Sequence, residues 1–298
     1  MNNEVTIVTY NKKNDLMKKI AIITGADGDM GREITKEVAK AGYTTIMACL
    51  PSLRAEQVHT KIQKETNGDI ILLPLDLAST ESIFSFVEII RNEYKQIDIL
   101  INNAGVLYPK NKSLDNKWDY TTMVNYFGHY LLTNKLLPLH NEGGRIITVV
   151  SLTYRYGKIE PHFFECGRNS WVQQVKNYSN SKLALLYFSL DLAEQLKEKN
   201  IAVNCSDPGI VGTKIIAMNN RVFDIVCDFF ARPFMKSPKN GAKTAIYLAL
   251  NDNAGKISGG YFKNAKQIPI LPRVLQSNEN EILKNITRDL LSEKNISL

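Results

Sequence analysis

The sequence is short of the features that mark several large classes of protein. Its 298 residues include only four cysteines and four histidines. The cysteines have no paired spacing and the histidines form no HExxH or other ligand pattern, so we expect reduced thiols and no metal. No apolar run approaches the ~20 residues of a membrane span, and the N-terminal region has no secretory hydrophobic segment. These absences favour a soluble, cytoplasmic protein.

Nothing in the chain marks a boundary between two large domains. It has no internal repeat, low-complexity tract or linker rich in proline, glycine and serine, and 298 residues can bury one sizeable α/β core. We expect an N-terminal extension at 1–16 and a single domain at 17–298. The extension contains VTIVTY, which fits an edge strand and a disordered segment equally well. Near the other end, EILKNITRDLL predicts a short amphipathic helix at about 278–292.

Glycines interrupt the first predicted strand-to-helix connection. The segment IAIITGADGDMGREITKEVAK begins with the apolar run Ile20–Ile23 and then turns at Gly25, Gly28 and Gly31. Helical spacing of apolar residues follows. Such a turn lets backbone N–H groups and the positive end of a helix approach a pyrophosphate. The glycines alone are a weak signal.

Polar and glycine residues also follow the later predicted strands. IDILI runs into Asn102, Asn103, Ala104 and Gly105, RIITVV ends at Ser151, and IAVNCS precedes Asp207, Pro208 and Gly209. Open parallel sheets bind ligands at the carboxyl ends of their strands, so these residues are candidates for one shared site.

Tyr178 and Lys182 are four residues apart in a predicted helix and should lie on one face, about one turn apart. A free tyrosine phenol has a pKa near ~10, which makes it a poor acid–base catalyst at neutral pH. A nearby ammonium favours the phenolate, and we expect it to lower this pKa. The pair alone is common by chance, so its meaning depends on the other motifs.

Together the motifs resemble the short-chain dehydrogenase/reductase family, and within it the retinol-dehydrogenase-like members, over about residues 18–270. The resemblance rests on Thr24-Gly25, Asp76-Leu77, Asn102 to Gly105, Asn125, Ser151, Tyr178 with Lys182, and Pro208-Gly209 with Thr213. It implies an α/β fold with a doubly wound parallel sheet, the Rossmann fold, in a single domain. It also implies an oxidoreductase that interconverts an alcohol and a carbonyl.

The same resemblance implies roles for individual residues. Tyr178 would be the general acid and base, Lys182 would lower its pKa and hold the nicotinamide ribose, and Ser151 would position the substrate oxygen. Asn125 would bind a water that links Lys182 to solvent. The implied cofactor-binding residues are Gly25, Gly28, Asp29, Met30, Gly31, Arg54, Asp76, Leu77, Asn103, Ala104, Gly105, Tyr178, Lys182, Pro208, Gly209, Val211 and Thr213.

Asp29 is where the chain departs from this family, which usually has glycine at that position. The spacing of Gly25, Gly28 and Gly31 matches instead the extended, epimerase-like branch. A carboxylate there either repels a bound phosphate or caps the following helix. An epimerase or dehydratase, and a non-catalytic dinucleotide-binding protein, are therefore the alternatives to an oxidoreductase.

The second predicted strand ends at Met47–Pro51 without the acid that often holds an NAD ribose, and Leu50 stands where related members have arginine. Arg54 remains within reach of a 2′-phosphate, so we favour NADP(H), with NAD(H) open. The formal net charge of +7 suits an anionic dinucleotide, and no nucleic-acid motif accompanies the scattered lysines.

Two predictions concern substrate and assembly. The apolar segment at about 210–236 is either a buried packing helix or a lid over a lipophilic or aromatic alcohol or carbonyl. The resembled family forms two-fold dimers through its long helices, so we expect a homodimer or homotetramer. Tyr130, Leu185 and Phe188 are candidates for that interface.

Overall fold

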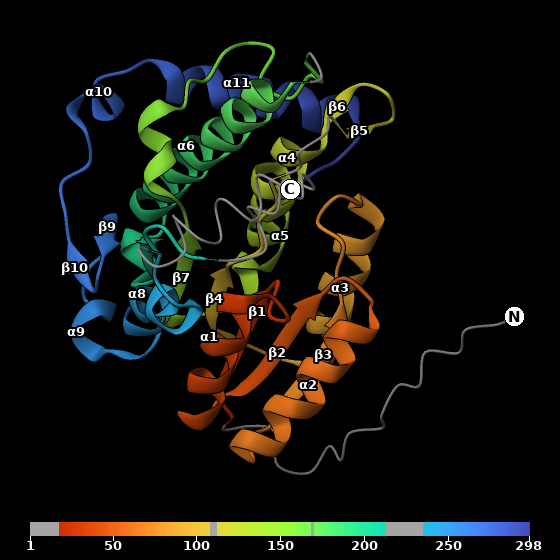
Figure 1. The fold of residues 1–298 in the computed structure, drawn as a ribbon, viewed down its shortest axis with the longest axis vertical. Helices are drawn as coiled ribbons and strands as arrows, with labels where there is room; N and C mark the ends of the chain where they lie inside the picture. The colour runs from red at the N-terminus through yellow and green to blue at the C-terminus, as the bar shows by residue number, and fades with distance from the viewer. Residues whose placement is uncertain (1–17, 108–111, 168–169, 213–234) are drawn as a thin grey trace, which may run out of the picture.

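The computed structural model of this chain describes residues 18–107, 112–167, 170–212 and 235–298 (Figure 1). Several predictions fall outside those residues. They are the extension at 1–16, Cys227, Thr213 and most of the expected lid at about 210–236.

An eight-stranded sheet forms the centre of the molecule, in the order β10-β9-β8-β7-β4-β1-β2-β3 (Figure 1). Neighbouring strands are parallel except β9 and β10. The strands are β1 (Ile20–Thr24), β2 (Thr44–Cys49), β3 (Ile70–Pro74), β4 (Ile97–Asn102), β7 (His140–Val149), β8 (Ala202–Asp207), β9 (Gly260–Lys263) and β10 (Lys266–Gln267). The strand order reverses between β1 and β4, where doubly wound sheets bind ligands. The predicted doubly wound parallel sheet is confirmed.

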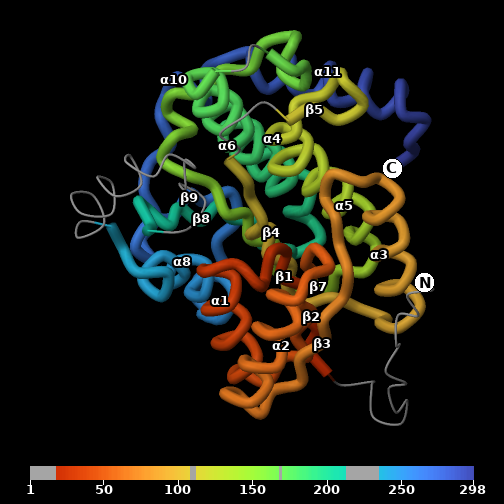
Figure 2. Tube along the Cα trace, turned by 45° about the vertical axis from the view of Figure 1, so that its right-hand side comes forward, coloured from red at the N-terminus to blue at the C-terminus, as the bar shows by residue number. Residues whose placement is uncertain are grey.

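Helices cover both faces of this sheet (Figure 2). The longer ones are α1 (Asp29–Lys40), α2 (Leu53–Thr66), α3 (Thr80–Glu93), α5 (His129–Leu136), α6 (Trp171–Gln195), α8 (Pro238–Leu250) and α11 (Glu279–Glu293). Helices α1, α2 and α8 share one buried apolar cluster, and α3, α5, α6 and α11 share the other. Ile22 belongs to the second cluster and Ile23 to the first, because alternate strand residues face opposite sides.

Shorter elements complete the described part of the chain. They are β5 (Ser113–Leu114), β6 (Trp118–Asp119), α4 (Tyr120–Thr122), a π-helix at Met123–Gly128, α9 (Asp252–Gly255), α10 (Pro272–Leu275) and 3₁₀ turns at Leu137–Leu139, Leu152–Tyr156 and Lys197–Lys199. The π-helix lies directly before α5. It contains Asn125, one of the predicted site residues.

Helix α11 lies where the sequence pattern placed a short helix, and it packs against the body of the protein. The Tyr126 hydroxyl lies 3.0 Å from the Thr287 hydroxyl of α11. Glu279, at the first position of α11, accepts hydrogen bonds from the backbone N–H of Ile159 (2.8 Å) and the hydroxyl of Tyr187 (3.2 Å). The C-terminal segment is thus tied to α6 and to the stretch between Ser151 and Tyr178.

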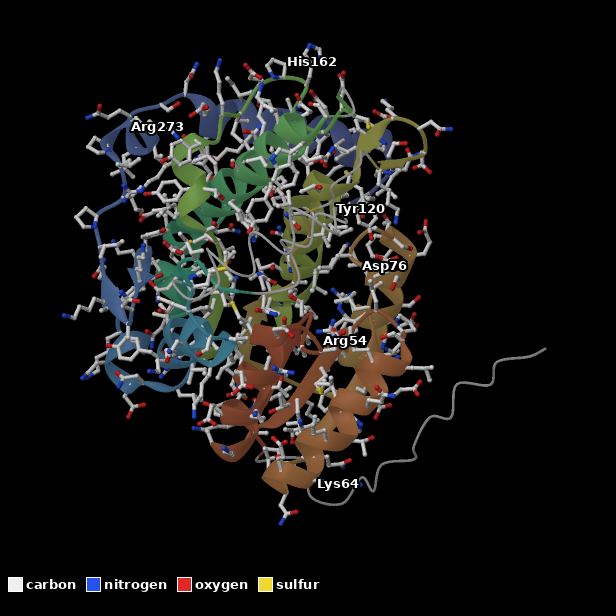
Figure 3. All side chains as sticks on the ribbon, viewed as in Figure 1. Arg54, Lys64, Asp76, Tyr120, His162 and Arg273 are labelled. Carbon is white, nitrogen blue, oxygen red and sulfur yellow. The ribbon has the colours of Figure 1, made fainter. Side chains whose placement is uncertain are left out.

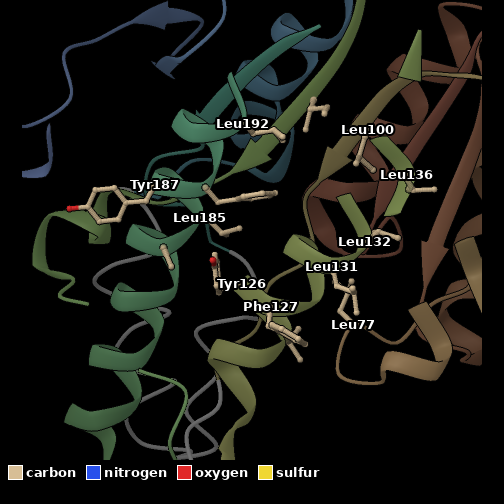
Figure 4. Packing of buried hydrophobic residues seen from close by; sticks show 14 of the residues in the cluster. Leu77, Leu100, Tyr126, Phe127, Leu131, Leu132, Leu136, Leu185, Tyr187 and Leu192 are labelled. Carbon is tan, nitrogen blue, oxygen red and sulfur yellow. The ribbon is translucent and has the colours of Figure 1, made fainter. Parts of the chain in front are cut away.

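This packing changes the prediction about the interface. Leu185 (Figure 4) and Phe188 are buried within the chain. The ring of Tyr130 lies 5.0 Å from that of Phe188. The interface prediction is therefore wrong for Leu185 and Phe188, because they belong to the same apolar cluster as Leu283, Leu290 and Leu291 of α11. The oligomeric state itself stays a prediction.

Candidate active site

The glycine turn lies at the carboxyl end of β1, pressed against the residues that follow β4. Gly25 has a φ of +59°, and a Cβ at this position would lie 2.9 Å from the Cα of Ala104. A Cβ at Gly31 would lie 2.2 Å from the carbonyl oxygen of Gly25. Both positions require glycine, since such distances are shorter than real Cβ contacts. The turn therefore brings the backbone as close to the β4 end as glycine allows.

Helix α1 begins without a side-chain cap. Gly28 is the N-cap residue, and no side chain bonds to the first amides of the helix. By contrast, Ser52, Ser79, Ser170 and Ser237 cap α2, α3, α6 and α8 through their hydroxyls. The uncapped N–H groups of α1, together with the helix dipole, suit an anion such as a pyrophosphate. The residues present thus fit a dinucleotide cofactor.

Asp29 is the first residue of α1, and its carboxylate pairs with Arg54 near the start of α2. Figure 3 labels Arg54. The Arg54 guanidinium lies 3.5 Å from Asp29 Oδ1, 3.7 Å from Asp27 Oδ2, and donates to the Asp27 carbonyl at 3.1 Å. The proposal that Asp29 caps the helix is therefore not what the structure shows. Instead, two carboxylates of the glycine turn hold the cation expected to meet a 2′-phosphate.

The residues after β4 hold the glycine turn in place. Thr24 Oγ1 accepts from the backbone N–H of Asn103 at 2.9 Å and of Ala104 at 3.0 Å. The Asn103 amide donates back to the carbonyls of Thr24 (2.9 Å) and Gly25 (3.2 Å). Asn102 points elsewhere and donates to the Thr133 hydroxyl. Asn103 and Ala104, predicted to contact the cofactor, thus also form the hydrogen bonds that shape its turn.

The other predicted cofactor-binding residues lie around the same edge. Asp76, half-buried, accepts from the Ala78 N–H at 2.8 Å. Leu77 is buried in the core. Met30 and Val211 come together at Gly241 of α8, where a Cβ would lie 3.2 Å from the Met30 sulfur and 2.6 Å from a Val211 methyl.

The end of β8 at Asp207 leads into a turn through Pro208 and Gly209 that is held by the buried Asp207 carboxylate. Asp207 accepts from the Gly209 N–H at 2.8 Å and from the Tyr261 hydroxyl at 2.6 Å. The Pro208 carbonyl accepts from Lys236 at 3.1 Å. The sequence motif included Asp207 without giving it a role, and nothing local could have revealed its partner on β9.

Tyr178 and Lys182 lie on α6, facing the ends of β4 and β7. The Lys182 ammonium nitrogen is 5.5 Å from the centre of the Tyr178 ring, and it donates to the Val149 carbonyl at 3.0 Å. It also lies 3.4 Å from where a Gly105 Cβ would be. Ser151 begins the 3₁₀ turn after β7, and its Oγ accepts from the Thr153 N–H at 3.3 Å. The fold thus gathers Tyr178, Lys182, Ser151 and Gly105.

The pKa values of this pair are shifted by burial. Tyr178 is half-buried by surface area, yet enough protein surrounds its hydroxyl to raise its pKa to about 12, partly offset by a hydrogen bond from Ser151. The Asp207 charge adds to the increase. Burial lowers the pKa of Lys182 to about 8. The expected lowering of the phenol pKa is therefore wrong for this arrangement, in which desolvation dominates and the Lys182 proton is donated to Val149.

The side chain of Asn125 is fully engaged inside the protein. Its Oδ1 accepts from the Val106 N–H at 2.8 Å, and its Nδ2 donates to the Val106 carbonyl and the Ser181 hydroxyl, both at 3.0 Å. It therefore joins the loop after β4 to the helix that carries Tyr178. The sequence placed Asn125 at the site but did not indicate these partners.

Metal-binding and membrane-spanning features were searched for in the parts of the chain that the structure describes. Those residues contain no group of three or more His, Cys, Asp or Glu side chains placed to hold a metal ion. None of their helices is long and apolar enough to cross a membrane. Cys49 and Cys205 are buried free thiols, as expected.

Comparison with known proteins was made against families, sequences and solved structures. A family model described as short chain dehydrogenase matches residues 19–222. Retinol dehydrogenase 12 of Bos taurus is 34% identical over 280 residues, which cover 93% of this chain and 87% of that protein. Retinol dehydrogenase 14 of Mus musculus is 33% identical over 279 residues, covering 87% of this chain and 82% of that protein.

Solved structures share the fold. An uncharacterised protein from Mycobacterium paratuberculosis superimposes with a TM-score of 0.71 at 22% identity, covering 93% of this chain and 95% of that one. A short chain dehydrogenase from Shigella flexneri, complexed with NADP, gives a TM-score of 0.64 at 23% identity, covering 85% of this chain and all of the other.

Proposed function

Because this chain belongs to the short-chain dehydrogenase/reductase family as a retinol-dehydrogenase-like member, and is thus an oxidoreductase acting on CH–OH groups, we propose that it interconverts a lipophilic alcohol and its carbonyl with NADP(H). One observation carries the proposal. The buried Lys182 lies between the Tyr178 ring and Gly105, where the catalytic helix meets the loop that shapes the glycine turn. Acid–base and dinucleotide-binding groups therefore share one edge of the sheet.

The chemistry divides between the cofactor and the chain. When bound, the nicotinamide supplies or accepts the hydride. Tyr178 donates the proton to the carbonyl oxygen in reduction and accepts it in oxidation, and Ser151 orients that oxygen. Lys182, whose pKa is lowered to about 8, stays protonated at neutral pH. When the Lys182 ammonium group turns from the Val149 carbonyl toward the site, its charge lowers the free energy of the Tyr178 phenolate.

Two features support NADP(H). The end of β2 presents Cys49, Leu50 and Pro51, with no carboxylate to hold a ribose 2′-hydroxyl. Arg54, half-exposed, is a cation beside the glycine turn. The solved relative from Shigella flexneri was complexed with NADP, and one from Escherichia coli with NADPH. In the structure, Arg54 already forms ion pairs with Asp27 and Asp29, and these pairs would compete with a 2′-phosphate for its guanidinium.

A lipophilic substrate is supported by exposed apolar side chains near the site residues in sequence and by the relatives' names. Tyr156, Trp171, Val172 and Ile210 are large, apolar and exposed, and each lies within seven residues of a proposed site residue in the chain. Exposed apolar residues that gather near a site favour an apolar ligand. The similar proteins from cattle and mouse are named for retinol, an apolar alcohol.

The test is turnover by the purified full chain. A panel of retinal, aliphatic and aromatic aldehydes, and the matching alcohols, would be mixed with NADPH, NADH, NADP or NAD, and nicotinamide absorbance followed. We expect net oxidation of NADPH with apolar aldehydes, and none with Tyr178→Phe. Cofactor binding without net turnover would favour the epimerase or scaffold alternatives, and preference for NADH would overturn the cofactor assignment. The cytoplasmic location and homo-oligomeric state stay predictions, which cell fractionation and light scattering would test.

A further inference from the structure

His129 is a fully buried histidine that the sequence motifs leave without a role. It is the first residue of α5, directly after the π-helix that contains Asn125. Its Nδ1 lies 2.9 Å from the backbone oxygen of Asn125, and its Nε2 lies 3.0 Å from Thr24 Oγ1. The ring therefore joins the end of β1 to the backbone of a proposed site residue.

The direction of each hydrogen bond in this chain follows from the chemistry of the partners. Burial lowers the pKa of His129 to about 4, so the ring is neutral at physiological pH. A backbone carbonyl can only accept, so Nδ1 carries the proton and Nε2 is the acceptor. Thr24 then donates its single hydroxyl proton to Nε2 at 3.0 Å in preference to the Ile101 carbonyl at 3.4 Å, while it accepts from the N–H groups of Asn103 and Ala104.

The π-helix changes the hydrogen bonding around the Asn125 carbonyl. In an α-helix the N–H of residue 129 would bond to that carbonyl, but here it bonds to the Tyr126 oxygen instead. The imidazole of the same residue supplies a donor to the Asn125 carbonyl through Nδ1. The turn is also fixed from outside, since a Cβ on Gly128 would lie 2.3 Å from the Leu77 oxygen.

We propose that His129 is a positioning residue, which holds the backbone of Asn125 so that its side chain keeps the Val106 loop and Ser181 of the catalytic helix in register. The inference builds on the proposed oxidoreductase function. Asn125 Oδ1 lies 3.7 Å and the Lys182 nitrogen 3.4 Å from the Gly105 Cβ position, so a rotation of Asn125 disturbs the place where both meet. The ring nitrogens of His129 bond to the Asn125 backbone and to Thr24, and the charge of Lys182 helps to lower the pKa of the ring.

Two substitutions separate the two nitrogens of the ring. His129→Asn places an amide N–H where Nδ1 is and retains the bond to Asn125. His129→Gln reaches toward Thr24 instead. The bond expected for His129→Asn, from an asparagine amide to the backbone oxygen four residues earlier, already occurs in this chain, where Asn134 donates to the Tyr130 oxygen at 2.8 Å. His129→Leu removes both bonds while keeping similar bulk.

The first measurement needs no turnover. Hydrogen exchange of the Val106 amide, which bonds to Asn125 Oδ1, is followed in the chain without ligands, with strand amides of Leu100 and Ile147 as internal controls. We expect exchange at Val106 to accelerate at least tenfold in His129→Leu and His129→Gln relative to the strand controls, and to stay near the original rate in His129→Asn. Equal acceleration at all three amides, or equal behaviour of the Asn and Gln variants, would mean that His129 is merely structural and would overturn the proposal. The Asn and Gln pair decides the matter if the Leu variant fails to fold.

The second measurement uses turnover. We expect kcat to fall roughly 10- to 100-fold in His129→Leu and His129→Gln, since misplacement of about 1 Å costs that much, with the Kd for cofactor changed less than about twofold. His129→Asn should recover most of kcat. A loss of cofactor affinity with kcat unchanged would overturn the proposal, because it would place the effect at the glycine turn. If the unsubstituted chain shows no turnover, the proposed function fails, and hydrogen exchange alone decides the role of His129.

Discussion

Replacing Asp29 by asparagine removes one negative charge from the glycine turn and keeps the shape of the side chain. Asp29 is mostly shielded from solvent (17% exposed), pairs with Arg54 at 3.5 Å, and makes no capping hydrogen bond. The cost in folding stability is therefore limited to the helix dipole and one half-exposed ion pair, together about 0.5 to 1.5 kcal/mol. The larger effect should be on dinucleotide binding.

The magnitude follows from the charges around the turn. A pyrophosphate at the start of α1 would lie about 5 Å from the first side chain of the helix, and at an effective dielectric constant of ~20 the repulsion is about 3 kcal/mol. Arg54 neutralises part of it, so we expect Asp29→Asn to tighten binding by about 1 to 2 kcal/mol, or roughly 5- to 30-fold. The gain should be larger for NADP(H) than for NAD(H), because only the former carries a 2′-phosphate to meet the released Arg54.

Calorimetric titration with both cofactors measures the effect, at low salt and at about 0.5 M salt, where partly exposed charges are screened. Glu281→Gln is the matched control, since it removes one charge from the first turn of α11 at the other end of the molecule (Figure 1). Repeating the titrations in an Arg54→Met background isolates the arginine. The reasoning would be refuted by an affinity for Asp29→Asn no higher than for the control. A preference for NADP(H) over NAD(H) that persists in the Arg54→Met background would refute the role of Arg54 in binding the 2′-phosphate.

Three further predictions concern the buried ionisable groups. Tyr178→Phe should lower kcat by about 10²- to 10⁴-fold and leave the Kd for cofactor nearly unchanged, as single-turnover and titration experiments would show. Lys182→Met should reduce both turnover and cofactor affinity. It should also raise the free energy of unfolding at pH 7 by up to about 3 kcal/mol, because folding lowers the pKa of Lys182 from 10.5 to about 8. This gain in stability should shrink between pH 8 and 10.5, and a gain that stays constant with pH in denaturant titrations would contradict the prediction. Folding lowers the pKa values of His129 and His140 from 6.5 to about 4. Their contribution to the free energy of unfolding is therefore full above pH 6.5 and falls by up to about 3 kcal/mol for each as the pH drops to 4. In thermal melts, His140→Phe should weaken this dependence of stability on pH.

Much of the fold was readable from local patterns. Apolar runs followed by glycine, asparagine, serine or aspartate predicted β1, β4, β7 and β8 and the edge where their carboxyl ends meet. Helical spacing predicted that Tyr178 and Lys182 share a face of one helix. These features depend on the period of a strand or helix and on turn chemistry, which neighbouring residues carry by themselves. The order of the motifs identified the family for the same reason.

The contacts between distant segments were decided by the tertiary structure. The sequence left Asp29 between repelling phosphate and capping its helix, and the fold brings Arg54, twenty-five residues further on, against it. It left Leu185 and Phe188 free for a partner, and the fold buries them in an apolar cluster that includes residues of α11. It predicted a lowered Tyr178 pKa from Lys182 alone, and the burial that reverses this comes from surrounding elements. The sequence by itself determined which residues reach the edge of the sheet, because period and turn are local. Only tertiary packing decided which of them neutralise, orient or bury one another, because those effects depend on distances between segments that no local pattern encodes.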